Sequence, residues 1–434
     1  MNVCSTRDER QLVPLSRAFA QGMAPDGGLY VPAPLPALSA RTLASAVALD
    51  LLAERLLAPF FQGDELAAEL PAIATEAFTF PAPLRPVGAG AERLSILELY
   101  HGPTAAFKDF GARFLAACLA RIPRPDPRIL TIVVATSGDT GGAVAAAFHG
   151  RPGFRVVLIY PAGRVSPLQE QQLTCWDGNI LSLAVRGSFD DCQRLAKEAF
   201  RDGTLRQAFP MSSANSINIG RLLPQITYFA AASLSIRETE TTLANFVIPS
   251  GNLGLAVACV WARELGLPIG EIVLAHNANR TVPDFLADGR WRPRPSIATI
   301  ASAMDVGDPS NIERLRFLYR DQATLTARIR AVSIGDDAIR NSIQTEYRQS
   351  GLTLCPHSAV AARAYRMLTD RERRDSHWVV VATAHPAKFQ ETVAPLIGHA
   401  IAPPPAFTRL LERPVVRMEI DASLDQLRER MLAA

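Results

Sequence analysis

Short apolar runs alternate with helical patterns through most of this chain, and this alternation constrains its fold more than any other feature. The helical patterns GGAVAAAF, FDDCQRLAKEAF and GLAVACVWAREL occupy 141–148, 189–200 and 254–265. Strands that are apolar on both sides and separated by helices indicate a mostly parallel sheet with both faces covered. We therefore predict an α/β, doubly wound architecture. The apolar runs are ILTIVVAT (129–136), RVVLIYP (155–161), ILSLAV (180–185), NFVIPS (245–250), EIVLAHNA (271–278) and WVVVATA (378–384).

The chain divides into three regions. A length of 434 residues exceeds what one compact core accommodates. Region 1–90 joins the turn-rich MAPDGGLYVPAPLP (23–36) to an Ala/Leu helical pattern from Thr42 to Phe60. A cluster of Pro and Gly then places a boundary near Ala91. The α/β region spans 91–390 and has two subdomains, and 391–434 ends in SLDQLRERML, a helical pattern expected to pack on the body.

The amino-acid composition argues against global disorder and against some classes of binding partner. Hydrophobic residues make up 48% and charged residues 20% of the chain, which excludes global disorder. Lys+Arg 45 against Asp+Glu 42 leaves a net charge of +3 without basic runs, so neither nucleic acid nor an anionic membrane is indicated. A small-molecule partner is the better expectation.

Cysteine usage and the first residues indicate a reducing compartment. The six cysteines form no CxxC pair, which argues against disulfides and zinc knuckles. The start, MNVCSTRDERQ, lacks a signal-peptide pattern, and no stretch of about 18 apolar residues occurs. His357 and His385 lack metal-ligand spacing. We expect a soluble cytoplasmic protein without a metal site.

Two strand-to-helix junctions share a pattern that suits anions. They read Thr-Ser-Gly-Asp-Thr-Gly-Gly at 136–142 and Pro-Ser-Gly-Asn-Leu-Gly at 249–254. A helix start offers unpaired N–H groups and a partial positive charge, so each junction could hold an anionic group. The competing interpretation is that Ser, Asp and Asn only cap their helices. Neither loop is a Walker A or GxGxxG motif, so no nucleotide is indicated.

Lys108 is the candidate for covalent chemistry. In HGPTAAFKDFGARFLAACLAR (101–121), Thr104 is a possible helix cap and Lys108 lies near the first turn, among apolar residues. Burial disfavours the charged amine, which makes a nucleophile available for a Schiff base and would fit pyridoxal phosphate. The alternative is an ordinary lysine that reaches solvent or pairs with Asp109.

A third polar cluster, SANSINIGR (213–221), precedes a Leu/Ile-rich helical stretch. The Arg221 fork together with Asn215 and Ser216 suits a phosphate, because planar N–H pairs bind two oxygens at once. A solvent-facing cap is equally compatible with this pattern.

Several motifs in one order resemble the threonine synthase family, in its longer-chain branch with an extra N-terminal domain. The resemblance implies a fold-type II pyridoxal-phosphate enzyme, similar to the tryptophan synthase beta subunit, present as a monomer or homodimer. It also implies conversion of O-phosphohomoserine and water to L-threonine and phosphate by γ-elimination and β-addition. The motifs are HGPTAAFKDFG (101–111), ATSGDTGGAVAAAF (135–148), YPAGRVSPLQEQQL (160–173), SANSINIGR (213–221), IPSGNLG (248–254), ASAMDVGDPSN (301–311) and ATAHPAKF (382–389).

The resemblance implies roles for thirteen residues. Lys108 would form the Schiff base with pyridoxal phosphate, and Thr383 would hydrogen-bond its ring nitrogen. Asp139 would lie near the phenolic oxygen of the cofactor, and an ionised carboxylate is repelled there, so it should be protonated or turned away. The other roles are cofactor phosphate for Gly251, Asn252, Leu253 and Gly254, substrate carboxylate for Ser137, Gly138 and Thr140, and substrate phosphate for Asn215, Ser216 and Arg221.

Two positions depart from the family pattern. Leu255 stands where relatives carry Asn or Asp, and Arg280 stands where they tend to have an acidic residue. These departures motivate two alternatives: a diverged lyase or replacement enzyme on a related phosphorylated amino acid, and a non-catalytic homologue that keeps the fold.

Overall fold

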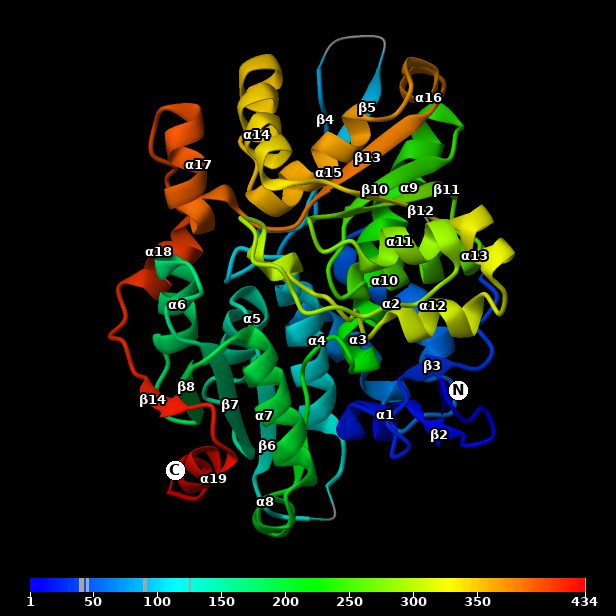
Figure 1. Cartoon of the computed structure of the whole chain (residues 1–434). Helices are drawn as coiled ribbons and strands as arrows, with labels where there is room; N and C mark the ends of the chain where they lie inside the picture. The colour runs from blue at the N-terminus through cyan, green and yellow to red at the C-terminus, as the bar shows by residue number, and fades with distance from the viewer. Residues whose placement is uncertain (39–42, 44–46, 89–91, 125, 434) are drawn as a thin grey trace.

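The computed structural model describes residues 1–38, 43, 47–88, 92–124 and 126–433. Strands in these residues form a three-stranded, a six-stranded and a five-stranded sheet. The two larger sheets, with helices around them, make up the body of the molecule (Figure 1). This is the predicted α/β architecture with mostly parallel sheets and an additional N-terminal part.

The six-stranded sheet has the order β12-β11-β10-β13-β5-β4. Its strands pair in parallel except for β4, which runs antiparallel to β5. Three predicted apolar runs form its central strands β10, β11 and β13. The strands are β4 (Leu84–Pro86), β5 (Arg93–Glu98), β10 (Ala244–Pro249), β11 (Ile269–His276), β12 (Arg330–Ser333) and β13 (His377–Ala382).

The five-stranded sheet has the order β14-β8-β7-β6-β9, and all of its pairs are parallel. The other three predicted runs form β6, β7 and β8. The edge strand β14 comes from the C-terminal segment, for which the sequence pattern predicts only a helix. The strands are β6 (Leu130–Ala135), β7 (Phe154–Pro161), β8 (Ile180–Arg186), β9 (Met211–Ser212) and β14 (Met418–Asp421).

Helices connect and cover the two sheets. Small residues along α4, α5 and α10 let these helices lie deeply buried between neighbouring layers. The helices of the body are α4 (Lys108–Arg121), α5 (Asp139–Phe148), α6 (Pro167–Thr174), α7 (Phe189–Arg201), α8 (Gly203–Ala208), α9 (Ile226–Glu240), α10 (Gly254–Glu264), α11 (Thr281–Asp288), α12 (Ile312–Leu318), α13 (Gln322–Arg328), α14 (Asp336–Ser350), α15 (Pro356–Arg366), α16 (Asp370–Asp375), α17 (Gln390–Ile397), α18 (Pro405–Leu411) and α19 (Leu424–Ala433). Single 3₁₀ turns are η2 (Ala67–Glu69), η3 (Ile219–Arg221), η4 (Leu223–Gln225), η5 (Ser302–Met304) and η6 (Pro386–Phe389).

The N-terminal segment packs against the body through its helices. The predicted helix from Thr42 begins at Leu49 instead; Thr42 and the predicted boundary at Ala91 lie outside the described residues. Helix α3 contacts α4, and Glu76 on α3 pairs with Arg121 on α4 at 2.8 Å. The elements are β1 (Asn2–Ser5), β2 (Val13–Pro14), α1 (Leu15–Gln21), β3 (Tyr30–Pro32), α2 (Leu49–Phe61) and α3 (Leu70–Ala77).

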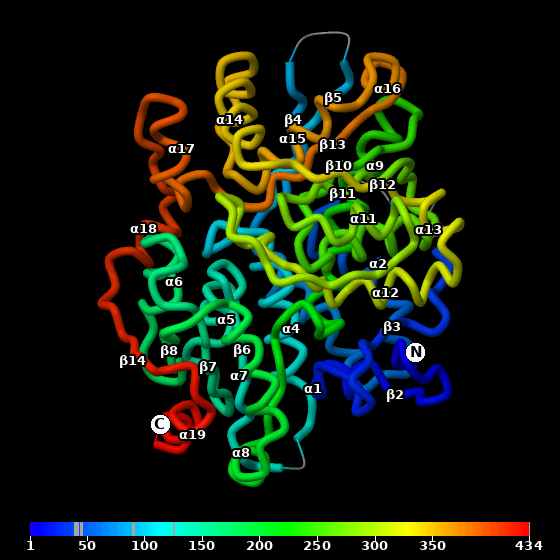
Figure 2. The backbone as a smooth tube through the Cα atoms, viewed as in Figure 1, coloured from blue at the N-terminus to red at the C-terminus, as the bar shows by residue number. Residues whose placement is uncertain are grey.

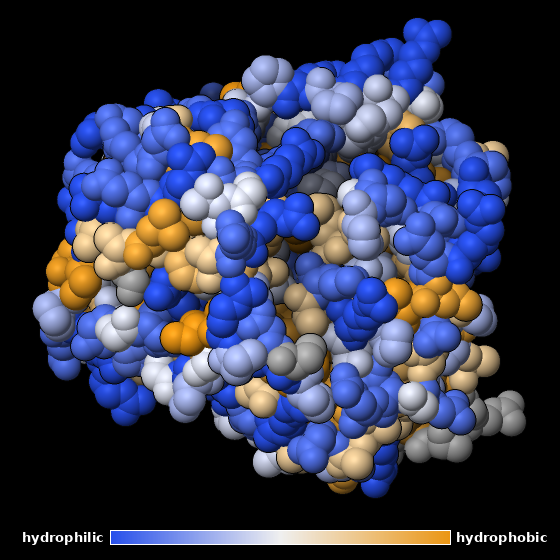
Figure 3. Space-filling view, turned by 90° about the horizontal axis from the view of Figure 1, so that it is seen from below, coloured by the Kyte–Doolittle hydropathy of each residue, from blue (hydrophilic) through white to orange (hydrophobic). Residues whose placement is uncertain are grey.

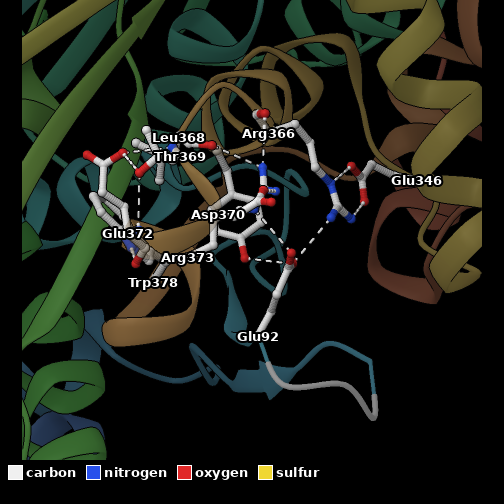
Figure 4. A network of polar contacts seen from close by, with 10 residues as sticks. Glu92, Glu346, Arg366, Leu368, Thr369, Asp370, Glu372, Arg373 and Trp378 are labelled. Carbon is white, nitrogen blue, oxygen red and sulfur yellow. Dashed lines mark hydrogen bonds and ion pairs between the residues drawn. The ribbon is translucent and has the colours of Figure 1, made fainter.

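A polar network ties the far end of the six-stranded sheet to the helices beyond it. Glu92, just before β5, accepts the Tyr365 hydroxyl at 2.9 Å and pairs with Arg366 and Arg373 (Figure 4). Arg366 also holds Glu346 of α14 at 2.9 Å. Strand β5, which leads toward Lys108, is thereby held to α14, α15 and α16.

The C-terminal segment returns to the five-stranded sheet. Figure 2 shows β14 and α19 beside β8 and α7, which precede them by more than 200 residues. Ile420 of β14 is buried in the same apolar cluster as Val157 and Leu183 of the sheet. The segment therefore completes this layer.

The face seen from below Figure 1 is mainly hydrophilic, with apolar residues in small groups (Figure 3). Among the described residues, no helix combines the length and apolar character needed to cross a bilayer.

Replacing Ile420 should test whether β14 is part of the folded core. Ile420→Ala is expected to lower the free energy of unfolding by about 3 kcal/mol, because it leaves a cavity at a fully buried position. Met418→Ala, on the same strand but exposed, is the control. Denaturant unfolding measures both variants, and equal small losses would mean that β14 is detachable.

Candidate active site

A cleft between the two larger sheets collects the predicted site residues. All of them except Gly138 line it, and both neighbours of Gly138 do so. They come from segments that follow β6, β9, β10 and β13 and from the start of α4. The carboxyl ends of parallel strands meet at one edge of each sheet, which is where α/β folds place their ligands. The fold thus brings together residues that are up to 275 positions apart.

Lys108 is the first residue of α4, and its side chain is 15% exposed toward the cleft. Its Nζ lies 3.9 Å from Oδ2 of Asp139. Burial lowers the pKa of Lys108 to about 8, and the charges of Lys388 and Arg221 act in the same direction against Asp139. A substantial fraction of this amine is therefore neutral near physiological pH, as a nucleophile requires.

Asp109 is not the partner of Lys108. Its buried carboxylate accepts the Thr104 N–H at 2.9 Å and the Thr104 hydroxyl at 2.6 Å. The predicted capping role of Thr104 is wrong: Phe107 is the N-cap of α4, and Thr104 donates to an acid in the first turn. Burial raises the pKa of Asp109 to about 6.

The loop before Lys108 is fastened to the segment after β13. Phe107 N–H donates to the Thr383 carbonyl at 2.9 Å, and His385 N–H donates to the Ala105 carbonyl at 3.0 Å. Ala105 adopts a left-handed backbone with φ 54°, which is costly for a residue with a Cβ. These bonds set the position of the lysine relative to Thr383.

Asp139 is ionised and held by a residue that the sequence analysis missed. Burial would raise its pKa, but Lys388 and Lys108 outweigh this and keep the pKa well below the usual range. Lys388 Nζ lies 2.7 Å from Oδ1, and the Gln169 amide donates to the same oxygen at 2.9 Å. The expectation of a protonated or turned-away Asp139 concerns the site with the cofactor bound; in the structure this carboxylate is turned toward Lys388 and Lys108, which favour its ionised form.

One signal in the sequence could have revealed Lys388. The chain has 45 Lys+Arg, yet only three are lysines: Lys108, Lys197 and Lys388. A composition that uses arginine almost everywhere makes each of the three lysines a candidate for a particular role, and of these only Lys197 is exposed.

The loop at 249–254 has an uncapped helix start. Leu253, the N-cap of α10, has φ 63° and makes no side-chain capping bond. Ser250 and Asn252 are engaged elsewhere: Ser250 donates to the Ile248 carbonyl, and Asn252 bonds outside the helix. The capping interpretation is thus wrong for this loop. Its N–H groups remain available for an anion.

At the first loop, Gly138 is the N-cap of α5, and neither Ser137 nor Asp139 caps the helix. Thr136 takes part of that role, since its hydroxyl accepts the Gly138 and Gly141 N–H groups. The Ser137 and Thr140 side chains line the cleft.

Ser216 is oriented by two amides. Its Oγ accepts Asn252 Nδ2 at 2.8 Å and Asn311 Nδ2 at 3.3 Å. Because both lone pairs are occupied, the hydroxyl proton is left to donate to an acceptor in the cleft. The buried Arg314 supports this loop by donating to the Ser216 carbonyl at 3.1 Å and to the Tyr30 carbonyl of β3 at 3.0 Å.

Arg221 is a buried cation without an anion. It is 2% exposed, donates to the Ala214 carbonyl, and forms no ion pair within the described residues. Its Nε has no hydrogen-bond partner there. Burial lowers its pKa to about 10, so the guanidinium stays charged at neutral pH. An unpaired buried charge beside Ser216 calls for an anionic ligand.

Thr383 and His357 contribute neutral groups to the cleft. The Thr383 backbone is fixed, since its N–H donates to Ser358 Oγ at 3.1 Å. Burial lowers the pKa of His357 to about 4, and its Nε2 accepts the Ala303 N–H at 3.0 Å. Within the described residues of the cleft lining, Asp139 is the only carboxylate.

Leu255 and Arg280, the two residues that depart from the family pattern, lie in different places relative to the cleft. Leu255 lines the cleft and places an apolar side chain beside the helix start. Arg280 lies outside the cleft lining, where its guanidinium pairs with Asp284 at 2.8 Å. Its charge is therefore balanced on its own helix.

These features fit pyridoxal phosphate. A buried amine lies near the uncapped start of α10, a neutral hydroxyl follows β13, and the cleft has an excess of positive charge. Such a site in two parallel layers defines a pyridoxal-phosphate-dependent enzyme, whose cofactor is pyridoxal 5'-phosphate. The family described as pyridoxal-phosphate dependent enzyme matches residues 78–384.

Further matches identify the branch. The families described as threonine synthase N terminus and threonine synthase, C-terminal match residues 2–78 and 358–430. Threonine synthases of Escherichia coli (strain K12) and Haemophilus influenzae are 38% and 39% identical, covering 100% of this chain and 99% and 100% of theirs. The chain belongs to the threonine synthase family.

Solved structures agree with this assignment. The crystal structure of Escherichia coli threonine synthase superposes with a TM-score of 0.91 at 37% identity, covering 100% of both chains. The structure of PLP-bound threonine synthase from Brucella melitensis superposes at 0.89 with 33% identity, covering 99% of this chain and 98% of that one.

Gly138→Ala should disturb the support of Asp139. Gly138 has φ 134°, and a Cβ there would lie 2.7 Å from Nε2 of Gln169, which holds Asp139. We expect a loss of about 2 kcal/mol or more in the free energy of unfolding. Gly163→Ala, with φ 67° and no atom within 4 Å of its Cβ, should lose only about 1 kcal/mol. Equal losses in denaturant unfolding would show that Gln169 moves aside freely.

Proposed function

We propose that the protein is a threonine synthase that converts O-phosphohomoserine and water to L-threonine and phosphate. The observation that carries this proposal is the unpaired buried Arg221 beside Ser216, in the same cleft as Lys108 and a second anion loop. A substrate with a phosphate at one end and a carboxylate at the other matches two separate anion sites flanking one amine.

The resemblance to the family and the shared cleft support a set of residues that would hold the cofactor. Lys108 would supply the amine for the Schiff base, and Thr383 would hydrogen-bond the ring nitrogen. The backbone of Gly251, Asn252, Leu253 and Gly254 would receive the cofactor phosphate. When bound, pyridoxal phosphate withdraws electrons from the substrate carbons next to the amine and makes their protons removable.

Substrate orientation is the work of two loops. Ser137, Gly138 and Thr140 receive the carboxylate at the start of α5. Asn215, Ser216 and Arg221 hold the phosphate; Asn215 is itself fixed by donating to the Ala135 carbonyl at 2.8 Å. Fixing both ends of the substrate places its central carbons within reach of Lys108.

Lys108 then moves the protons. Once released, its Nζ takes the α proton and then a β proton, and phosphate leaves from the γ carbon. Protonation at the γ carbon and addition of water at the β carbon complete threonine. A single amine can serve these steps because its pKa of about 8 lies near the working pH.

The working environment is also part of the proposal. We infer a cytoplasmic monomer or homodimer that acts on a small molecule. All six cysteines are unpaired and buried, which suits a reducing compartment.

A second candidate is a lyase that releases phosphate without making threonine. Leu255 favours it, because an apolar side chain in the cleft wall offers no hydrogen bond to the water that threonine formation requires. The two candidates differ in product: threonine with phosphate for the first, and 2-oxobutanoate with phosphate for the second.

Lys108→Ala tests the proposed role of the amine. With O-phosphohomoserine, the wild type should release phosphate and threonine in equal amounts, and the variant should lose at least about 10³-fold in kcat. The visible absorption of the bound cofactor should change in the same variant. Lys197→Ala, at an exposed lysine, is the matched control. A mass spectrum showing 2-oxobutanoate alone would support the lyase instead.

Arg221→Met tests the phosphate site. Removing the guanidinium should raise KM for O-phosphohomoserine about 10- to 100-fold, the range for a charge-assisted hydrogen bond. Arg221→Lys should recover part of this because it keeps the charge without the fork. An unchanged KM in steady-state kinetics would remove Arg221 from the substrate site.

A further inference from the structure

Two of the three lysines of this chain face one buried carboxylate. Lys388 lies in η6, and its side chain is fully inaccessible to solvent. Its ammonium lies 2.7 Å from Asp139 Oδ1 and donates to the Thr104 carbonyl at 2.8 Å. Asp139 Oδ2 is turned to Lys108 at 3.9 Å. Lys388 is thus a buried charged group that takes part in none of the catalytic steps above.

The net charge of Lys388, Asp139 and Lys108 depends on whether Lys108 is protonated. In a buried pair of one lysine and one carboxylate, loss of the lysine proton leaves an unpaired anion, which is costly. Here the group of Lys388, Asp139 and charged Lys108 carries one net positive charge. When Lys108 becomes neutral, the remaining pair of Lys388 and Asp139 is balanced.

We propose that Lys388 is a positioning residue: it is the standing counter-ion of Asp139, so that Lys108 can release and regain its proton while that carboxylate stays neutralised. This inference rests on the proposed role of Lys108 as the base. Lys388 does not touch the substrate; it acts through Asp139.

The surrounding groups do not replace Lys388. His357 and His385 are neutral at physiological pH, because burial lowers the pKa of each to about 4. Arg221 adds to the positive field at Lys108 but forms no ion pair with Asp139 among the described residues. Asp109 faces the same region, yet its oxygens are taken by Thr104.

Lys388 and Lys108 face different oxygens of the Asp139 carboxylate. Gln169 and Lys388 both donate to Oδ1, which leaves Oδ2 for Lys108. Through the Thr104 carbonyl, Lys388 also ties η6 to the loop that precedes α4. An arginine fork is wider than an ammonium, but it preserves the positive charge at this position.

The test measures the protonation of Lys108 directly. The full chain without cofactor is labelled with trace acetic anhydride from pH 6 to 11, and the three lysine peptides are followed by mass spectrometry. Lys388→Met should move the labelling midpoint of Lys108 up by at least one pH unit, which from a pKa of about 8 means about fivefold less neutral amine at pH 8. Lys388→Arg should stay within half a unit of wild type, as should Lys197→Met at the exposed control lysine.

The cofactor-loaded enzyme provides a second readout. The acid limb of its pH profile of kcat, which reports the enzyme–substrate complex in which Lys108 is released, should shift upward in Lys388→Met, with recovery in Lys388→Arg. If the labelling midpoint moves but this limb does not, Lys388 sets the charge of Lys108 while the proposed function of Lys108 as base fails. A labelling midpoint in folded Lys388→Met that does not rise overturns the inference.

A double variant covers the case in which Lys388→Met does not fold. In Asp139→Asn with Lys388→Met, both members of the balanced pair are removed, so the net charge facing Lys108 is the same as in the wild type. The labelling midpoint of Lys108 should then return to within half a unit of the wild-type value, whereas Asp139→Asn alone should lower it. A double variant whose midpoint equals that of Asp139→Asn would refute the proposal.

Discussion

The site depends on an excess of buried positive charge. Lys108, Lys388 and Arg221 are withdrawn from water around a cleft whose described lining contains one carboxylate, Asp139. Burying cations costs free energy, and this cost is reduced when anionic ligands enter. A cofactor phosphate and a doubly anionic substrate supply those charges, so binding and neutralisation are the same event.

Side chains without negative charge hold the cationic site in place. Ser216 is oriented by Asn252 and Asn311, and Arg314 anchors the same loop to the N-terminal segment through Tyr30. None of these supports adds negative charge, so the loop is rigid without competing with the ligand. The N-terminal segment is therefore connected to the phosphate side of the cleft by buried side chains that include Arg314 and Asn218, whose amide donates to the Phe19 carbonyl of α1 at 2.9 Å.

Much of the fold and the site could be predicted from local sequence. The six apolar runs became strands because residues apolar on both faces suit the interior of a covered parallel sheet. The site residues converged because they follow strand ends. What could not be predicted depended on distant contacts: Lys388 meets Thr104 across 284 positions, and the same lysine forms an ion pair with Asp139. The partly exposed strand β14 lacks an apolar run and gave no signal.

The pairing of β14 with β8 affects how the protein folds while it is being synthesised. Strand β14 covers one edge of the sheet that carries the carboxylate loop, and it is synthesised after every residue of the cleft lining. Until then β8 is an open edge with unpaired backbone groups, which invites pairing with other nascent chains. A message that ends prematurely would thus yield a product prone to aggregate, even though every residue of its cleft had already been translated.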